Sequence, residues 1–258
     1  MPTEPTRNLH YVLEGASDKP VLVMSNSLGT TLEMWDPQMA ALTAQYRVLR
    51  YDTRGHGRSA LPAASFGMHE LAEDVIAIMD HAGIERAHFC GLSMGGMTGM
   101  VLARHHATRF HRFVLANTAA LIGPASVWDT RIETVRRDGM SAIVDGVLAR
   151  WFTEDYLLTR RDEMAPVRRM LETTSADGYT ANCAAVRDAD LRALLPEIDA
   201  PVLVIAGEHD LSTTAAQGGL VAGAIDGAYY LSLSAAHLSN WELPEAFGDA
   251  VLGFLAQR

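Results

Sequence analysis

Short apolar runs alternate along the chain with longer segments at helical spacing, and this alternation constrains the fold more than any other feature of the sequence. The strand candidates are Val21 to Ser25, Arg47 to Tyr51, Ala87 to Cys90, Arg112 to Ala116, Val202 to Ala206 and Tyr229 to Leu233. The clearest helical patterns are His69 to His81, Met94 to His105 and Pro244 to Leu255. Because crossovers of this length join parallel strands, the pattern predicts an α/β fold with a mostly parallel central sheet flanked by helices. His10 to Leu13 is expected to begin an antiparallel edge.

The alternation stops between about Leu121 and Val186, where the residues favour helices and no strand is apparent. It resumes at PVLVIAGEHD, so the chain returns to the same sheet. We therefore predict a helical cap, residues 121–186, inserted into a core made of residues 1–120 and 187–258. Large apolar residues at helical spacing usually pack inside a protein, so Trp151, Met164 and Met170 are interpreted as packing residues of the cap.

The composition limits the partners that the chain can have. A formal net charge of −10 repels a phosphate backbone or an anionic membrane surface, so neither nucleic acid nor membrane is an expected partner. An anionic small molecule would need a local cation inside a pocket. No secretory signal and no apolar run of roughly 18 residues is present, which predicts a soluble cytoplasmic protein. Two cysteines, Cys90 and Cys183, are too few for a disulfide framework or a multi-thiolate metal site.

One strand candidate runs directly into Gly91-Leu92-Ser93-Met94-Gly95 and then into a helical pattern. Gly-x-Ser-x-Gly between a strand and a helix is typical of a nucleophile elbow, a sharp turn that exposes a serine hydroxyl above a sheet. The strained turn requires small residues at Gly91 and Gly95. The N–H of Met94, at the start of the helix, is a candidate donor to an oxyanion. Alone, the motif is also compatible with a tight helix entry, but other positions agree with catalysis.

A serine nucleophile needs a base, and the base needs an orienting acid. Asp210 follows the strand candidate PVLVIAG and His237 follows YYLSLS, so both lie at carboxyl ends of strands, where α/β sheets place functional residues. One helix and one strand separate them, which predicts adjacent loops over one edge of the sheet. His209 is expected to point elsewhere, and the strand after the elbow helix ends in Asn117-Thr118, which offers no carboxylate. The sequence thus predicts Ser93 as nucleophile, His237 as general base and Asp210 as the orienting acid.

The chain resembles the α/β-hydrolase family over nearly its full length. VLVMSNSLGTTLEMW is similar to the family's first strand and oxyanion loop, YDTRGHGRS to its turn after the next strand, and GEHD and AAHLSNWELPEAF to its acid and histidine loops. The resemblance implies that the Leu28 N–H is the second oxyanion donor beside that of Met94. The oxyanion loop begins with Asn26-Ser27 where most members carry His-Gly. In the turn, Asp52, Arg54 and His56 are expected to satisfy one another.

SNSLGT, YDTRGHGRS, GLSMGG and HLSN also resemble the 3-oxoadipate enol-lactonases of bacterial aromatic catabolism. This closer resemblance implies hydrolysis of 3-oxoadipate enol-lactone to 3-oxoadipate in the β-ketoadipate pathway, without a cofactor. The free carboxylate of such a substrate requires a partner, and the cap segment SVWDTRIETVRR offers Trp128 as a wall and Arg131 as an anion clamp. For any one cap arginine, an exposed pair with a neighbouring carboxylate is the competing interpretation.

The same scaffold serves several reactions, because the fold carries the catalytic groups and the cap selects the substrate. A carboxylesterase, a perhydrolase and a carbon–carbon bond hydrolase therefore remain alternatives, each acting on a small molecule. A hydrolase-like ligand receptor is an alternative of another class, since it would retain its product after a slow single turnover.

Overall fold

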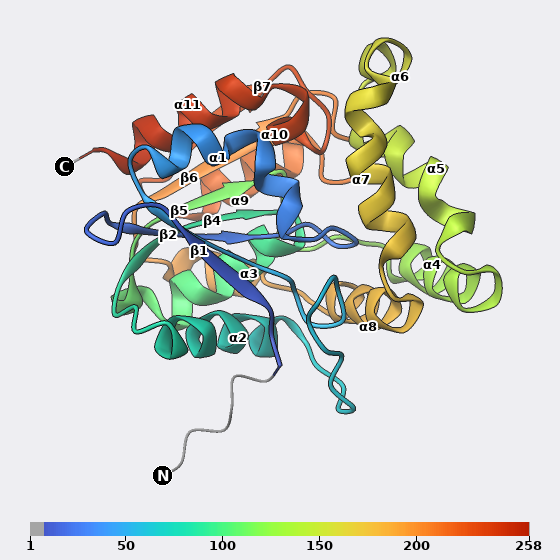
Figure 1. Cartoon of the computed structure of the whole chain (residues 1–258), viewed down its shortest axis with the longest axis horizontal. Coiled ribbons are helices and arrows are strands. Elements are labelled where there is room, and N and C mark those ends of the chain that lie inside the picture. Colours follow the sequence, from blue (N-terminus) through green and yellow to red (C-terminus); the bar gives the residue numbers. More distant parts are fainter. Residues whose placement is uncertain (1–7, 258) are drawn as a thin grey trace.

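The computed structural model describes residues 8–257, and within them one seven-stranded sheet has the order β1-β3-β2-β4-β5-β6-β7 (Figure 1). The strands are β1 (Tyr11–Glu14), β2 (Val21–Ser25), β3 (Arg47–Tyr51), β4 (Ala87–Leu92), β5 (Phe110–Ala116), β6 (Val202–Gly207) and β7 (Tyr229–Leu233). β1 pairs antiparallel with β3, and all other neighbours are parallel. The predicted α/β fold with a mostly parallel sheet is therefore confirmed.

Helices cover both faces of the sheet. On one face lie α1 (Asp36–Thr43), α10 (Ser239–Glu242) and α11 (Pro244–Leu255), and on the other lie α2 (Met68–His81), α3 (Met94–His105) and α9 (Ala215–Ala224) (Figure 1). Short 3-10 helices span Leu32–Trp35, Ala107–Arg109 and Arg192–Glu197. Strand side chains alternate between the two apolar cores, with Val23 against α2 and α3 and Met24 against α1 and α11. Burial on both faces explains why the strands read as continuous apolar runs.

Between β5 and β6 the chain forms five further helices, which lie together to one side of the sheet in Figure 1. They are α4 (Ala125–Asp138), α5 (Ser141–Trp151), α6 (Glu154–Thr159), α7 (Arg161–Thr173) and α8 (Ala176–Arg187). Trp151, Met164 and Met170 are buried in an apolar cluster, as their spacing predicted. The division of the chain into a core and a cap at residues 121 and 186 stays a prediction. Among the helices of residues 8–257, none has the length and apolar character to span a bilayer.

The turn that follows β3 agrees with its prediction only in part: His56 Nδ1 lies 3.3 Å from the Arg54 carbonyl oxygen, but the other polar groups of Asp52, Arg54 and His56 have partners outside the three. Asp52 Oδ1 accepts a hydrogen bond from the Leu32 N–H at 2.9 Å, and Arg54 Nε donates to Asp74 Oδ2 at 2.6 Å. His56 Nε2 accepts the Gly29 N–H at 2.9 Å. Folding brings other segments around the turn, and their buried polar groups need partners that the turn supplies.

Helix α8 packs directly against this turn. Asn182 Nδ2 donates to the Arg54 carbonyl oxygen at 2.9 Å. A Cβ placed on Gly178 would overlap the Gly55 carbonyl group, so only glycine at 178 allows the two backbones to approach this closely. Helix α8 is therefore held to the turn by backbone contact.

We predict that Gly178→Ala lowers the free energy of unfolding by about 1–3 kcal/mol, because the added methyl group forces the helix and the turn apart. The control is Gly219→Ala in α9, where no neighbouring atom lies within 4 Å of the added Cβ. That change should raise stability by up to about 1 kcal/mol, since alanine favours a helix over glycine. Urea unfolding of both variants checks the prediction, and equal effects would contradict it.

Candidate active site

Ser93 occupies the turn between β4 and α3 with φ 60° and ψ −116°. A non-glycine residue with positive φ is strained and persists only where the surroundings enforce it. A Cβ on Gly91 would overlap the Gly95 carbonyl group, and one on Gly95 would overlap that of Ser25. The predicted need for small residues on both sides of Ser93 is thus met.

Neighbouring strands hold this turn in place. The Ser93 N–H donates to the Ala116 carbonyl oxygen at 2.9 Å, and Thr118 Oγ1 donates to the Ser93 carbonyl oxygen at 2.8 Å. Both partners lie at the carboxyl end of β5. The backbone of the elbow is therefore tied to the next strand of the sheet.

Asp210 and His237 follow β6 and β7 and meet at the same edge of the sheet. His237 Nδ1 donates to Asp210 Oδ2 at 2.8 Å, and the two side chains are 2% and 0% exposed. The predicted adjacency of the two loops is therefore found. With Nδ1 engaged by the acid, Nε2 is the imidazole nitrogen left to exchange a proton.

The Asp210 carboxylate has several further donors. Oδ1 accepts the N–H groups of Ser212 at 2.7 Å and Thr213 at 2.9 Å, and Thr213 Oγ1 donates to Oδ2 at 2.8 Å. Burial alone would raise the pKa of Asp210, but His237 and these backbone N–H groups outweigh it and hold the pKa below its ordinary value. The acid is therefore ionised at neutral pH.

Asn117, which the sequence analysis set aside for lacking a carboxylate, joins the two loops. Its Nδ2 donates to Asp210 Oδ2 at 3.2 Å and to the Ala236 carbonyl oxygen at 3.1 Å. Its Oδ1 accepts from Ser239 Oγ at 2.6 Å. A polar residue at the carboxyl end of β5, the neighbour of β6, was the signal that could have identified it.

Ser93 and His237 line one cavity of about 260 Å³. Leu28 also lines it, and within residues 8–257 its N–H has no hydrogen-bond partner. Met94, the first residue of α3, is buried and is not part of the cavity wall. In the described part of the chain no hydrogen bond joins Ser93 Oγ to His237, and bonds of this kind often tighten only when substrate binds.

Two arginines from the helices between β5 and β6 line the same cavity. Arg131, from α4, lies over the Trp128 ring at 4.8 Å from its centroid, and Arg150 comes from the end of α5. Neither forms an ion pair with a carboxylate of residues 8–257. Burial and the nearby Arg131 lower the pKa of Arg150. The cavity is therefore locally positive although the chain carries a net charge of −10.

The structure thus brings the predicted Trp128 and Arg131 to the cavity of Ser93, and it adds residues that sequence reasoning missed. Trp151, interpreted only as a packing residue, stacks on the His237 ring with centroids 6.0 Å apart and planes at 29°. Arg150 carried no signal beyond its place beside Trp151, because periodicity does not reveal which groups a helix end faces.

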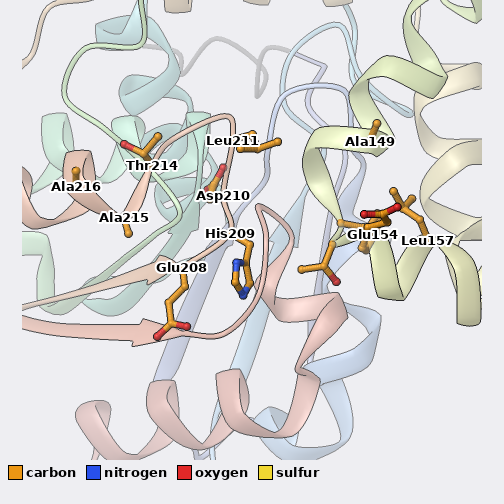
Figure 2. A pocket seen from close by; sticks show the side chains of 12 residues that line it. Ala149, Glu154, Leu157, Glu208, His209, Asp210, Leu211, Thr214, Ala215 and Ala216 are labelled. Carbon is orange, nitrogen blue, oxygen red and sulfur yellow. The ribbon is translucent and has the colours of Figure 1, made fainter.

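A larger cavity of about 890 Å³ lies between α5, α6 and the loop after β6 (Figure 2). Ser93 and His237 do not line it. Figure 2 shows His209 and Asp210 pointing in different directions, and His209 Nε2 lies 3.3 Å from Ser234 Oγ. His209 is therefore not a partner of the acid, as expected, and the smaller cavity is the candidate active site.

No group of three or more His, Cys, Asp or Glu side chains among residues 8–257 is arranged to hold a metal ion. Cys90 and Cys183 are buried free thiols, and burial raises the pKa of both. Deprotonation to a reactive thiolate is therefore disfavoured at both positions.

A family model described as the alpha/beta hydrolase fold matches residues 20–244. The chain therefore belongs to the α/β-hydrolase fold family and is a hydrolase.

Among its relatives are two enzymes of Acinetobacter baylyi. 3-Oxoadipate enol-lactonase 2 is 43% identical, over 94% of this chain and 91% of the relative. 3-Oxoadipate enol-lactonase 1 is 39% identical, over 96% and 93%. The crystal structure of the enol-lactonase from Burkholderia xenovorans LB400 is 49% identical, covers 96% of both chains and superposes with a TM-score of 0.95.

We predict that Asp210→Asn destabilises the protein at pH 7 by about 1–3 kcal/mol, because the buried donors lose a charged acceptor. Since the folded-state pKa of Asp210 is below its ordinary value, its carboxylate stabilises the folded state above about pH 4 and ceases to do so as the pH falls through the folded value. The difference between variant and parent should therefore shrink below about pH 4. Urea unfolding at several pH values measures it, with the exposed Asp226→Asn as control. A difference that is constant with pH would contradict the prediction.

Proposed function

We propose that the chain hydrolyses 3-oxoadipate enol-lactone to 3-oxoadipate, through an acyl-enzyme on Ser93. The observation that carries the proposal is the cavity itself. A strained serine, an imidazole bound to a buried carboxylate and two arginines that pair with no acid of residues 8–257 line one space of about 260 Å³. The names of the relatives from Acinetobacter baylyi support the same substrate, and the name of the Burkholderia xenovorans enzyme supports an enol-lactone.

Acylation begins when Ser93 Oγ attacks the lactone carbonyl while His237 Nε2 accepts the hydroxyl proton. Asp210 holds the imidazole by Nδ1 and stabilises the imidazolium that forms. The N–H group of Leu28, from the cavity wall, and that of Met94, whose backbone follows Ser93 at the start of α3, donate to the developing oxyanion. Each such donor is worth ~3 kcal/mol of the barrier.

Ring opening breaks the carbon–oxygen bond of the lactone and releases an enolate that stays attached to the acyl group. His237 returns a proton to this oxygen, and the enol becomes a ketone, which disfavours closure of the ring. Water then attacks the acyl carbon, His237 accepts its proton, and Ser93 Oγ is regenerated. No external cofactor takes part.

The substrate carries one carboxylate away from the reacting carbonyl, and Arg131 and Arg150 are its proposed partners. Trp128 forms a wall under Arg131, with the guanidinium 4.8 Å from the ring centroid. Arg131 and Arg150 are half-buried, and their guanidinium groups repel each other. A bound carboxylate offsets this repulsion. The two arginines attract the substrate carboxylate only at short range. At long range, the net charge of −10 repels it.

We predict that Ser93→Ala folds normally but loses hydrolysis by a factor on the order of 10⁴ or more. The direct measurement is the loss of enol-lactone absorbance with purified protein. Urea unfolding controls for folding. The proposal requires that the parent protein hydrolyse many equivalents of the lactone. Near-parental turnover by Ser93→Ala would contradict the mechanism.

We predict that Arg131→Met and Arg150→Met each raise KM for the carboxylated lactone about 10- to 100-fold, the loss expected for a hydrogen bond to a charged group, ~1.5–3 kcal/mol. Methionine keeps the apolar stem and removes the charge. Hydrolysis of the neutral enol-lactone α-angelica lactone should be little changed in both variants.

The control is Arg168→Met, since the Arg168 side chain is 44% exposed, pairs with Asp145 at 2.5 Å and does not line the cavity of Ser93, so its loss should affect neither substrate. Equal losses on charged and neutral lactones would contradict the anion clamp. A parent protein that prefers neutral esters to both lactones would favour the carboxylesterase alternative.

A further inference from the structure

The turn after β3 contacts the loop that carries the Leu28 N–H. His56 is 1% exposed, and its Nε2 accepts the Gly29 N–H at 2.9 Å. Its Nδ1 lies 3.3 Å from the Arg54 carbonyl oxygen, so the ring proton belongs on Nδ1 and Nε2 is free to accept. Burial lowers the pKa of His56 to about 4, which keeps the imidazole neutral at physiological pH.

The peptide on the other side of Leu28 is also held. The Ser27 carbonyl oxygen accepts hydrogen bonds from Thr30 Oγ1 at 2.7 Å and from the Thr30 N–H at 3.2 Å. In a trans peptide the N–H points opposite to the carbonyl, so this bond directs the Leu28 N–H away from Thr30. Leu28 lines the cavity with Ser93, and its N–H is without a partner in the described chain.

The start of the loop is fixed to the sheet by Asn26, the residue that replaces the family's histidine. Its Nδ2 donates to the Tyr51 carbonyl oxygen at 2.7 Å, and its Oδ1 accepts from Trp35 Nε1 at 2.9 Å. Asn26 and Thr30 thus constrain the segment up to the Ser27 carbonyl. The Leu28–Gly29 peptide has a single side-chain partner among residues 8–257, which is His56.

We propose that His56 is a positioning residue, whose neutral imidazole holds the Leu28–Gly29 peptide so that the Leu28 N–H remains directed at the oxyanion. This inference rests on the proposed function. An oxyanion donor lowers the barrier only if it is already aligned when charge develops. Without the His56–Gly29 bond, the loop has to be ordered during each reaction. Loss of the bond therefore slows the chemical step without weakening ground-state binding.

The test compares His56→Asn with His56→Gln. Asparagine retains a polar side chain that can donate to the Arg54 carbonyl, but it is too short to replace Nε2. Glutamine reaches the position of Nε2 with an oxygen that can accept the Gly29 N–H. We expect His56→Asn to lower kcat on the enol-lactone about 10- to 100-fold with KM within about twofold, and His56→Gln to recover most of kcat.

A second measurement separates positioning from general structural support. 4-Boronobutanoic acid forms a tetrahedral adduct with a serine and places an oxygen where the oxyanion forms, whereas adipate binds without one. In His56→Asn the affinity for the boronic acid should fall in parallel with kcat, and the affinity for adipate should not change. The control is His88→Leu, since His88 lies near the amino end of β4 against the rings of Tyr46 and His111, and its loss should leave kcat at the parental value.

Parental kcat in His56→Asn, equal losses of boronate and adipate affinity, or no recovery in His56→Gln would each overturn the proposal. These outcomes differ from failure of the proposed function, in which the parent protein itself does not hydrolyse the lactone or Ser93→Ala remains active.

Discussion

The strained backbone of Ser93 is the constraint on which the rest of the site depends. A residue with φ 60° stays in that conformation only where its surroundings enforce it, and here Ala116 and Thr118 bind its peptide groups. On both sides of Ser93, neighbouring backbone carbonyl groups lie too close to allow a Cβ at Gly91 or Gly95. Sheet stability and site geometry are therefore not separable, since the packing that buries the strands also holds the serine at the edge where the β6 and β7 loops meet.

Charge is divided between the two parts of the chain that form the cavity. The sheet supplies the buried carboxylate of Asp210, whose charge is matched by His237 and backbone donors. The helices between β5 and β6 supply Arg131 and Arg150, which have no acidic partner in the described residues. In a chain of net charge −10, screening over about 8–10 Å lets these two cations govern the cavity while the surface remains acidic. An anion inside the cavity would therefore meet a local positive charge.

Loops that carry no catalytic group of their own connect these parts. The turn after β3 bonds to Leu32, Gly29 and Asp74 and receives helix α8 at Gly55. It therefore contacts both the loop after β2 and helix α8. Hydrogen bonds and backbone contacts thus form a continuous chain from α8 through the turn to the loop that holds Leu28.

The sequence alone determined the features that follow from local chemistry. Apolar runs predicted the strands, small residues around Ser93 predicted the elbow, and positions after strands predicted Asp210 and His237, because in a parallel sheet the carboxyl ends share one edge. Tertiary structure decided which groups face the cavity. Arg150 and Trp151 end a helix whose orientation depends on packing. Asn117 bonds to Asp210, 93 residues away in sequence, and His56 Nε2 bonds to Gly29 in another loop. Such contacts are set by which segments fold against each other, and no local pattern encodes them.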